Sequence, residues 1–112
     1  MINAAILGAS GFVGAELLRL LDLHPHIHAS RLFGDSQAGQ ALADVHPHLA
    51  LAYPCAQVER YEPAALDGID LVFAALPHGH SQRVAPEILE RGLAFVDLGA
   101  DFRLNSADDY KL

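Results

Sequence analysis

Three glycines spaced three residues apart, Gly8, Gly11 and Gly14, form the part of this chain best suited to bind a ligand. They follow the apolar run Ile2–Leu7 and open an amphipathic stretch, Phe12–Leu23. Strand, glycine-rich turn and helix, in that order, are the dinucleotide-binding pattern in its required context. The first glycine permits a tight turn, the second lets N–H groups approach a pyrophosphate, and the third lets the helix pack closely on the sheet. The phosphates would lie at a helix N-terminus, where unpaired N–H groups and the helix dipole favour an anion.

The composition describes one globular domain and excludes several classes of partner. The 112 residues are 52% hydrophobic and 19% charged, which is enough for a packed core. Seven basic and fourteen acidic residues give a formal charge of −7 without a Lys/Arg cluster, so we expect no nucleic-acid partner. No apolar run approaches the ~20 residues of a membrane span, and no secretion signal is recognisable. We therefore expect a cytoplasmic protein whose backbone dipoles, rather than a basic patch, hold any phosphate.

Predicted strands and helices alternate along the chain, as in a doubly wound parallel sheet. Buried strands are predicted at Ile2–Leu7, Ile27–Phe33, Leu71–Leu76 and Leu93–Leu98, and a short strand at Gln57–Arg60. Helices are predicted at Phe12–Leu23 (apolar face Val13, Leu17, Leu20, Leu21) and at Ser81–Arg91 (cap Ser81, apolar face Val84, Ile88, Leu89). Shorter helical pieces are predicted within Ala41–Leu51, at Pro63–Leu66 and at the start of Asn105–Leu112.

The fold class is therefore α/β, a Rossmann-like NAD(P)-binding domain. Such a fold usually has more strands and a substrate domain. We expect residues 1–112 to be the dinucleotide-binding N-terminal piece of a longer two-domain enzyme, truncated before its catalytic domain. A face covered by later elements would then be bare and would favour self-association.

Three loops follow the three strongest strands, and the carboxyl ends of parallel strands share one edge of the sheet. The loops are Gly8–Gly14, Pro77–Ser81 and Gly99–Arg103. Their polar groups are expected to converge on one crevice despite their distance in sequence.

Four segments, spread over essentially the whole chain, resemble the N-acetyl-γ-glutamyl-phosphate reductase family. They are Gly8–Leu17, His46–Leu49, Leu76–Ser81 (LPHGHS) and Asp97–Leu104, which contains ADFRL. The resemblance implies an oligomeric, NADP-dependent oxidoreductase of arginine biosynthesis, similar to semialdehyde dehydrogenases. It would reduce N-acetyl-γ-glutamyl phosphate to the semialdehyde through a cysteine thioester, with a histidine as acid/base. In the family that cysteine lies downstream of ADFRL, so we expect no catalytic residue in this chain.

The resemblance also assigns roles to individual residues. Pro77 and His78 match the loop beside the nicotinamide; a loop histidine without a role is the alternative for His78. Arg103 matches an arginine near the substrate pocket, where it suits an acyl phosphate or carboxylate; a salt bridge to Asp97 or Asp101 is the alternative. Gly99 stands where the family commonly has serine. The residues matching the pyrophosphate-binding turn are Gly8, Ser10, Gly11, Phe12, Val13 and Gly14, with a plain helix cap as the alternative for Ser10.

The cofactor preference is open at the turn after the second strand. The family often has Ser-Arg-Ser there, whereas this chain has Gly34, Asp35 and Ser36. Asp35 lies about twenty residues past Gly14, where NAD enzymes place a ribose-binding carboxylate that would repel a 2′-phosphate. Arg31 could compensate. We expect NADP from the resemblance and keep NAD as the alternative because of Asp35.

The remaining candidates are weaker. Cys55 lies outside the family's nucleophile segment and is expected to be an ordinary thiol. The histidines are expected to lie in near-surface turns rather than to bind metal, since no cysteine or carboxylate has metal-site spacing; they include His24, His26, His28, His46 and His48. The alternative functions are an aspartate-semialdehyde dehydrogenase, a lysine-pathway reductase of a carrier-bound acyl phosphate, and a stand-alone nucleotide-binding module.

Overall fold

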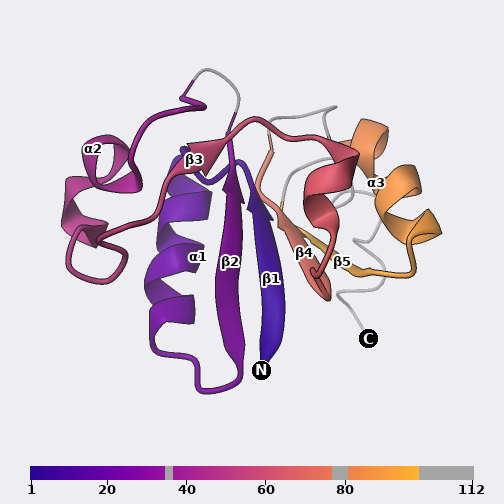
Figure 1. Ribbon diagram of the computed structural model, residues 1–112, viewed down its shortest axis with the longest axis horizontal. Coiled ribbons are helices and arrows are strands. Elements are labelled where there is room, and N and C mark those ends of the chain that lie inside the picture. Colours follow the sequence, from indigo (N-terminus) through magenta and orange to yellow (C-terminus); the bar gives the residue numbers. More distant parts are fainter. Residues whose placement is uncertain (35–36, 77–80, 99–112) are drawn as a thin grey trace, which may run out of the picture.

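A five-stranded, entirely parallel sheet forms the centre of the computed structural model (Figure 1). The structure describes residues 1–34, 37–76 and 81–98. The strands lie in the order β3-β2-β1-β4-β5, and their bounds are β1 Ile2–Leu7, β2 Ile27–Phe33, β3 Val58–Glu59, β4 Leu71–Ala74 and β5 Ala94–Asp97. The helices are α1 Phe12–Asp22, α2 Leu42–Val45 and α3 Ser81–Glu90, with 3-10 turns η1 Pro47–Leu49 and η2 Pro63–Leu66. The α/β doubly wound prediction is confirmed.

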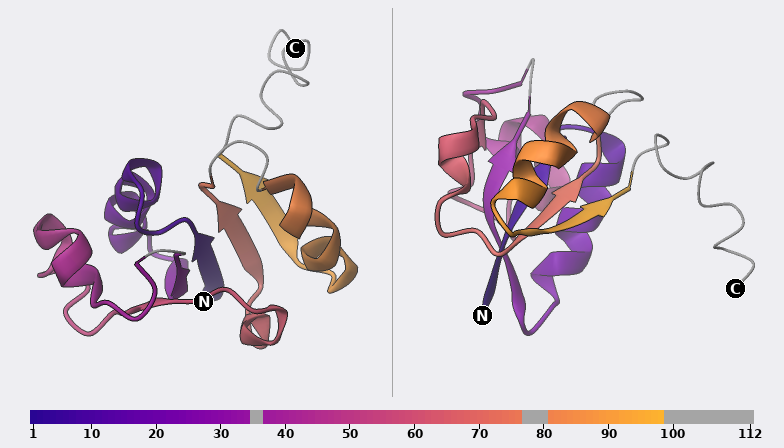
Figure 2. Two further views of the ribbon diagram at one scale, coloured as in Figure 1. Left: turned by 90° about the horizontal axis from the view of Figure 1, so that it is seen from above. Right: turned by 90° about the vertical axis from the view of Figure 1, so that its right-hand side faces the viewer.

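The strand order reverses at β1, because the chain builds β2 and β3 on one side of it and then crosses to β4 and β5 on the other. In a parallel sheet the crevice at such a reversal, outside the carboxyl ends of the strands, is where ligands bind. Helix α1 and helix α3 lie on opposite faces of the sheet (Figure 2). The glycine-rich turn after β1 therefore occupies the position that this topology favours for a ligand.

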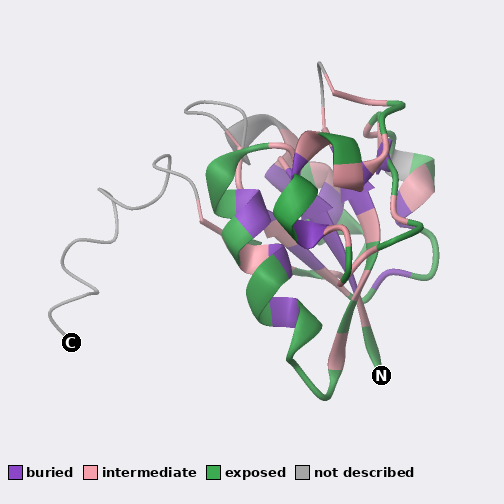
Figure 3. Cartoon of the chain, turned by 90° about the vertical axis from the view of Figure 1, so that its left-hand side faces the viewer, coloured by how far each residue is buried: buried purple, intermediate pink, exposed green. Residues whose placement is uncertain are grey.

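Two apolar clusters fill the two sides of the sheet, and Figure 3 shows buried residues concentrated in the central strands. The cluster on the α1 side is built from Ile6, Ala9, Ala15, Leu18, Leu21, Leu32, Leu42, Leu49 and Val58. The other is built from Ala5, Leu7, Phe33, Leu66, Ile69, Val72, Ala74 and Ile88. Neighbouring residues of β1 thus serve opposite clusters, as the alternation of side chains along a strand requires.

The buried face of α1 differs from the predicted one. Of the four residues expected on the apolar face, only Leu21 is buried, while Val13 and Leu20 are about half exposed. The buried residues are Gly14, Ala15, Leu18 and Leu21. Gly14 has no side chain, so the helix can pack with Gly14 directly against the backbone of the preceding turn. This orientation leaves Val13 and Leu20 partly exposed.

Two other predicted faces also need correction. Leu89 was assigned to the apolar face of α3 but is exposed, and Ile88 and Ala85 take the buried positions. The strand predicted at Leu93–Leu98 is only half-buried, because Ala94 and Val96 are exposed on one face of β5. This strand is the last in the sheet order, so it has a neighbour on one side only. The helix predicted from Asn105 lies outside the described residues.

No helix in the described part of the chain is long and apolar enough to cross a bilayer.

Candidate functional site

The glycine-rich turn is fastened to the ends of two other strands. The N–H groups of Gly8 and Ala9 both donate to the carbonyl of Phe33 at the end of β2, each over 2.9 Å. Gly8 has φ of +81°, and a Cβ there would lie 2.2 Å from the carbonyl oxygen of Ala75, just after β4. Any side chain at this position would combine a disfavoured backbone conformation with a clash against backbone. The close approach of the three chain segments therefore depends on glycine.

Helix α1 starts immediately above this turn. Gly11 is its N-cap residue in an extended conformation, and its carbonyl accepts the first helical hydrogen bond from Ala15 over 3.0 Å. A Cβ on Gly14 would lie 2.3 Å from the carbonyl oxygen of Gly8 and 2.9 Å from the Cα of Ala9. The third glycine thus lets the first turn of the helix rest directly on the backbone of the turn that follows β1.

Four backbone N–H groups at this helix start make no hydrogen bond within the described residues. They belong to Ser10, Phe12, Val13 and Gly14. Unpaired N–H groups are expected at a helix N-terminus, where together with the helix dipole they form an anion-binding site. The side chain of Phe12 is 94% exposed, so it is not packed into the core at the start of this helix. The arrangement fits the pyrophosphate of a dinucleotide.

The cap interpretation of Ser10 is wrong, because the N-cap of α1 is Gly11 and no side chain caps the helix. The Ser10 hydroxyl instead lies beside Gly34 at the end of β2, where an added Cβ would be 3.1 Å from its Oγ. The same Cβ would lie 2.7 Å from a methyl group of Val58. Gly34, named in the sequence analysis only as part of the turn after the second strand, thus packs directly against the Ser10 side chain of the glycine-rich turn.

The loop that follows Gly34 is held at both ends by β3. The Gly34 N–H donates to the carbonyl of Glu59 over 2.9 Å, and the Gly39 N–H donates to the carbonyl of Val58 over 2.7 Å. The short strand β3 therefore determines where this loop leaves and returns to the sheet edge. Asp35 and Ser36, the residues expected to discriminate NAD from NADP, lie in this loop but outside the described residues.

Arg31 makes an ion pair instead of pointing freely toward that loop. Its guanidinium donates to Oε1 of Glu59 over 2.8 Å, and both side chains are about two-fifths exposed. A partly exposed pair of this kind contributes less than ~1 kcal/mol, so it orients Arg31 more than it stabilises the fold. The pairing gives no support to the hypothesis that Arg31 offsets the charge of Asp35.

Two histidines depart from the expectation of near-surface turns: His28 lies in strand β2, and His46 is buried. His46 is 8% exposed, and its Nε2 lies 3.0 Å from the carbonyl oxygen of Ala9 in the glycine-rich turn. A carbonyl only accepts, so the Nε2–H must donate. The other histidines of the predicted group, His24, His26, His28 and His48, are exposed. No group of three or more potential metal ligands occurs among the residues that the structure describes.

Tyr53, seven residues after His46, makes a second side-chain hydrogen bond to a backbone carbonyl. Its hydroxyl donates to the carbonyl of Leu18 in α1 over 2.5 Å. Burial, followed by the negative charge of Asp22, raises the pKa of Tyr53 to about 12. The hydroxyl therefore stays protonated, and so a donor, throughout the physiological pH range.

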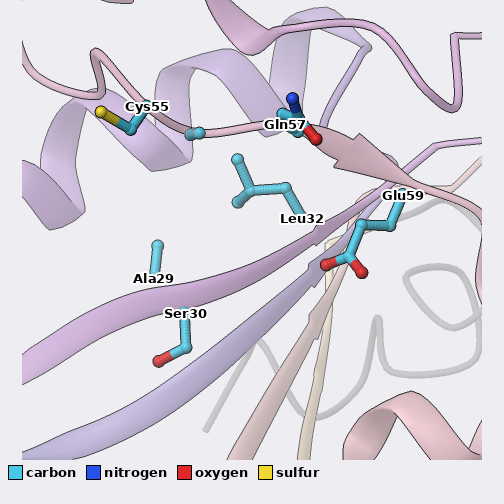
Figure 4. Close-up of a pocket in the computed structure, with 7 residues that line it drawn as sticks. Ala29, Ser30, Leu32, Cys55, Gln57 and Glu59 are labelled. Carbon is cyan, nitrogen blue, oxygen red and sulfur yellow. The ribbon is translucent and has the colours of Figure 1, made fainter.

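A cavity of about 270 Å³ lies beside β2, away from the glycine-rich turn (Figure 4). Ala29 and Leu32 of β2 line it together with Cys55 and Gln57, which lie on the segment leading into β3. No residue of the Gly8–Gly14 turn lines it. Cys55 is exposed, and its role as an ordinary thiol stays a prediction.

Three further predicted site residues, Pro77, His78 and Arg103, lie outside the described residues. The structure therefore brings together only one part of the expected crevice: the turn after β1, the end of β2 and the end of β4.

Comparison with known proteins agrees with this geometry. Residues 3–111 match the family model described as semialdehyde dehydrogenase, NAD binding domain. The chain belongs to this family. The chain is 50% identical over 111 residues to an N-acetyl-gamma-glutamyl-phosphate reductase of Paracoccus denitrificans, covering 98% of this chain and 32% of the relative. It is 48% identical over 110 residues to the protein of the same name from Streptomyces coelicolor, with 98% and 32% covered.

The domain spans about a third of the length of these curated relatives. Among solved structures, it resembles an aspartate semialdehyde dehydrogenase with NADP from Candida albicans with a TM-score of 0.80 and 26% identity, covering 92% of this chain and 31% of that one. Aspartate semialdehyde dehydrogenase II of Vibrio cholerae, at 19% identity and a TM-score of 0.71 with 92% and 29% covered, supports the fold alone. The resemblance stated from the sequence motifs is confirmed, and the domain is an NAD(P)-binding one.

Proposed function

We propose that this domain holds the nicotinamide cofactor of an N-acetyl-γ-glutamyl-phosphate reductase. The observation that supports this most strongly is the 38–50% identity to reductases of that name over nearly the whole domain. The glycine-rich turn adds a physical reason, since its unpaired N–H groups suit a pyrophosphate. In the proposed reaction an acyl phosphate, NADPH and a proton give an aldehyde, inorganic phosphate and NADP⁺.

Within that reaction the domain binds and orients, while the nucleophile is expected in the catalytic part that its relatives carry. The backbone of Ser10 to Gly14 would hold the pyrophosphate. Pro77 and His78 would lie beside the nicotinamide, and Arg103 near the substrate's anionic group. The intact enzyme is proposed to be a cytoplasmic homo-oligomer, as the sequence resemblance implies.

NADP is the proposed cofactor, in line with the resemblance stated from the sequence motifs and with the Candida structure that contains NADP. Asp35 is the residue that opposes this choice, because a carboxylate beside the ribose repels a 2′-phosphate. The preference of the domain for NADP or NAD thus depends on whether the negative charge of Asp35 outweighs the NADP preference that the resemblance implies.

Calorimetric titration of the 112-residue domain with NADP and with NAD tests the proposal. Saturable binding of either dinucleotide supports it, and the tighter one identifies the cofactor. If neither binds at millimolar concentration, while circular dichroism shows a folded domain, the proposed function of this domain is wrong.

The substrate can be tested in a chimera that joins this domain to the remaining two thirds of the Paracoccus reductase. Phosphate- and NADP-dependent oxidation of N-acetylglutamate semialdehyde would support the reductase assignment. Aspartate semialdehyde should be tested in parallel because of the similarity to the Candida enzyme. A chimera that binds NADP but oxidises neither aldehyde would refute a cofactor-presenting role for the domain.

A further inference from the structure

One buried side chain of the domain has no part in the function proposed so far. His46 is the only buried polar or charged residue among the described residues, and it comes from a segment 37 positions downstream of the residue it contacts. Its Nε2–H donates to the carbonyl of Ala9, which is itself fully buried. A buried donor and acceptor that satisfy each other hold their positions firmly, because losing either partner leaves the other unpaired.

The contact acts on a peptide group that the ligand would use. The carbonyl of Ala9 and the N–H of Ser10 belong to one planar peptide, so they point in opposite directions. By holding the carbonyl, His46 aims the Ser10 N–H away from the core. That N–H is one of the four at the start of α1 that make no hydrogen bond within the described chain. The imidazole of His46 therefore fixes the direction of the Ser10 N–H through the opposite end of the same peptide group.

The surrounding segment is built to hold the ring in place. His46 precedes Pro47, which disfavours the helical conformation at His46, and the φ and ψ of His46 are −130° and 82°. Its N–H donates to the carbonyl of Leu42 over 2.7 Å, and its carbonyl accepts from the N–H of Leu49 over 2.9 Å. Leu42 and Leu49 are both buried in the cluster below α1. Backbone and side chain of His46 are thus fixed independently.

We propose that His46 is a positioning residue for dinucleotide binding: it sets the orientation of the peptide between Ala9 and Ser10 so that the Ser10 N–H faces the pyrophosphate. This inference rests on the proposed dinucleotide-binding function. In this inference a side chain outside the glycine-rich turn contributes to the affinity for the dinucleotide. Because the contact is to the backbone, it would act on NAD and NADP alike.

The test compares three variants of the 112-residue domain. His46→Phe keeps an aromatic ring but removes the donor, whereas His46→Gln retains an N–H that can reach the same carbonyl. Tyr53→Phe is the matched control, because it also removes one side-chain bond to a backbone carbonyl, but at Leu18 in the middle of α1. The affinities for NADP and NAD are measured by calorimetry, and unfolding is measured in parallel.

If the loss of the bond lowers the fraction of correctly oriented turns to about one tenth, His46→Phe binds about tenfold more weakly. His46→Gln should recover most of the affinity, and Tyr53→Phe should bind like the unchanged domain even where it unfolds more easily. Equal affinity for the unchanged domain and His46→Phe would overturn the inference. A domain that binds no dinucleotide before any substitution would instead refute the proposed function.

A ligand-free measurement keeps the inference testable if His46→Phe does not fold. In the unchanged domain, the imidazole ¹⁵N spectrum should show a proton on Nε2 of His46, the nitrogen that faces the Ala9 carbonyl. A His46 ring protonated only at Nδ1 would overturn the inference directly.

Discussion

Replacing Gly14 by alanine should destabilise the domain, although alanine normally favours a helix. In an ordinary helix the exchange of glycine for alanine stabilises by about 1 kcal/mol. Here the new Cβ would lie 2.3 Å from the Gly8 carbonyl oxygen, a contact that real Cβ atoms do not make below 3.0 Å. The start of α1 must therefore move by at least 0.7 Å, the difference between these two distances.

The atoms that the new methyl group meets belong to the backbone of Gly8 and Ala9, so no rotamer change can relieve the contact. Overpacking of this kind costs about 1–3 kcal/mol, and we take the upper end because backbone must shift. After the helix-propensity gain, the free energy of unfolding should fall by about 2 kcal/mol. With a urea slope of about 1 kcal/mol per molar for a chain of this size, the midpoint falls by about 2 M.

Urea unfolding followed by circular dichroism measures this, with Gly92→Ala as control. Gly92 has a positive φ of 77° but nothing within 4 Å of its added Cβ, so that variant should lose only about 1 kcal/mol through its backbone conformation. If Gly14→Ala unfolds at the same or a higher urea concentration than the unchanged domain, the close-approach argument is refuted.

Three other predictions follow from burial, ionisation and charge. Ile88→Ala should cost about 3 kcal/mol and Leu89→Ala less than about 0.5 kcal/mol in urea unfolding, because only the first side chain is buried. Burial raises the pKa of Tyr53 from 10.0 to about 12, so the unfolded chain loses this proton first as pH rises and stability falls between pH 10 and 12. Tyr53→Phe should make the urea midpoint less dependent on pH in that window, and an unchanged slope would contradict the stated cause. Arg31→Ala should change the ratio of NADP to NAD affinity, measured by calorimetry, by less than about twofold. Asp35→Ser should raise that ratio about tenfold, because it removes about 1.4 kcal/mol of repulsion between the carboxylate and the 2′-phosphate.

Strand positions could be predicted closely from the sequence because uninterrupted apolar runs have visible ends. The run Ile2–Leu7 ends at a glycine and Ile27–Phe33 ends before Gly34, and both strands have these bounds in the structure. The predicted strand Leu71–Leu76 is two residues shorter in the structure, since Ala75 and Leu76 continue into a loop. Apolar composition locates a strand but does not say where its pairing stops.

Helix faces and buried loop residues could not be predicted in the same way. The periodicity of α1 places several leucines on neighbouring faces, and the choice between them depends on how closely Gly14 approaches the backbone of Gly8. His46 escaped prediction because its burial depends on Leu42 and Leu49 docking under α1, which is a tertiary event. The His-Pro pair flanked by those two leucines was the signal that could have suggested it.

The charge distribution explains why backbone groups must dominate the proposed site. The domain carries a formal charge of −7, and long-range electrostatics therefore oppose the approach of an anionic dinucleotide. Within the part of the chain that the structure describes, Arg19, Arg31 and Arg91 are paired with the carboxylates of Glu16, Glu59 and Asp67. The favourable contribution must then come from groups whose partial charge is fixed by the fold, which are the N–H groups at the start of α1. Such groups work only when correctly aimed, so an acidic domain that binds an anion needs rigid support for its turn more than a basic one does. The contacts of Gly8, Gly14 and His46 with the backbone of that turn supply this support.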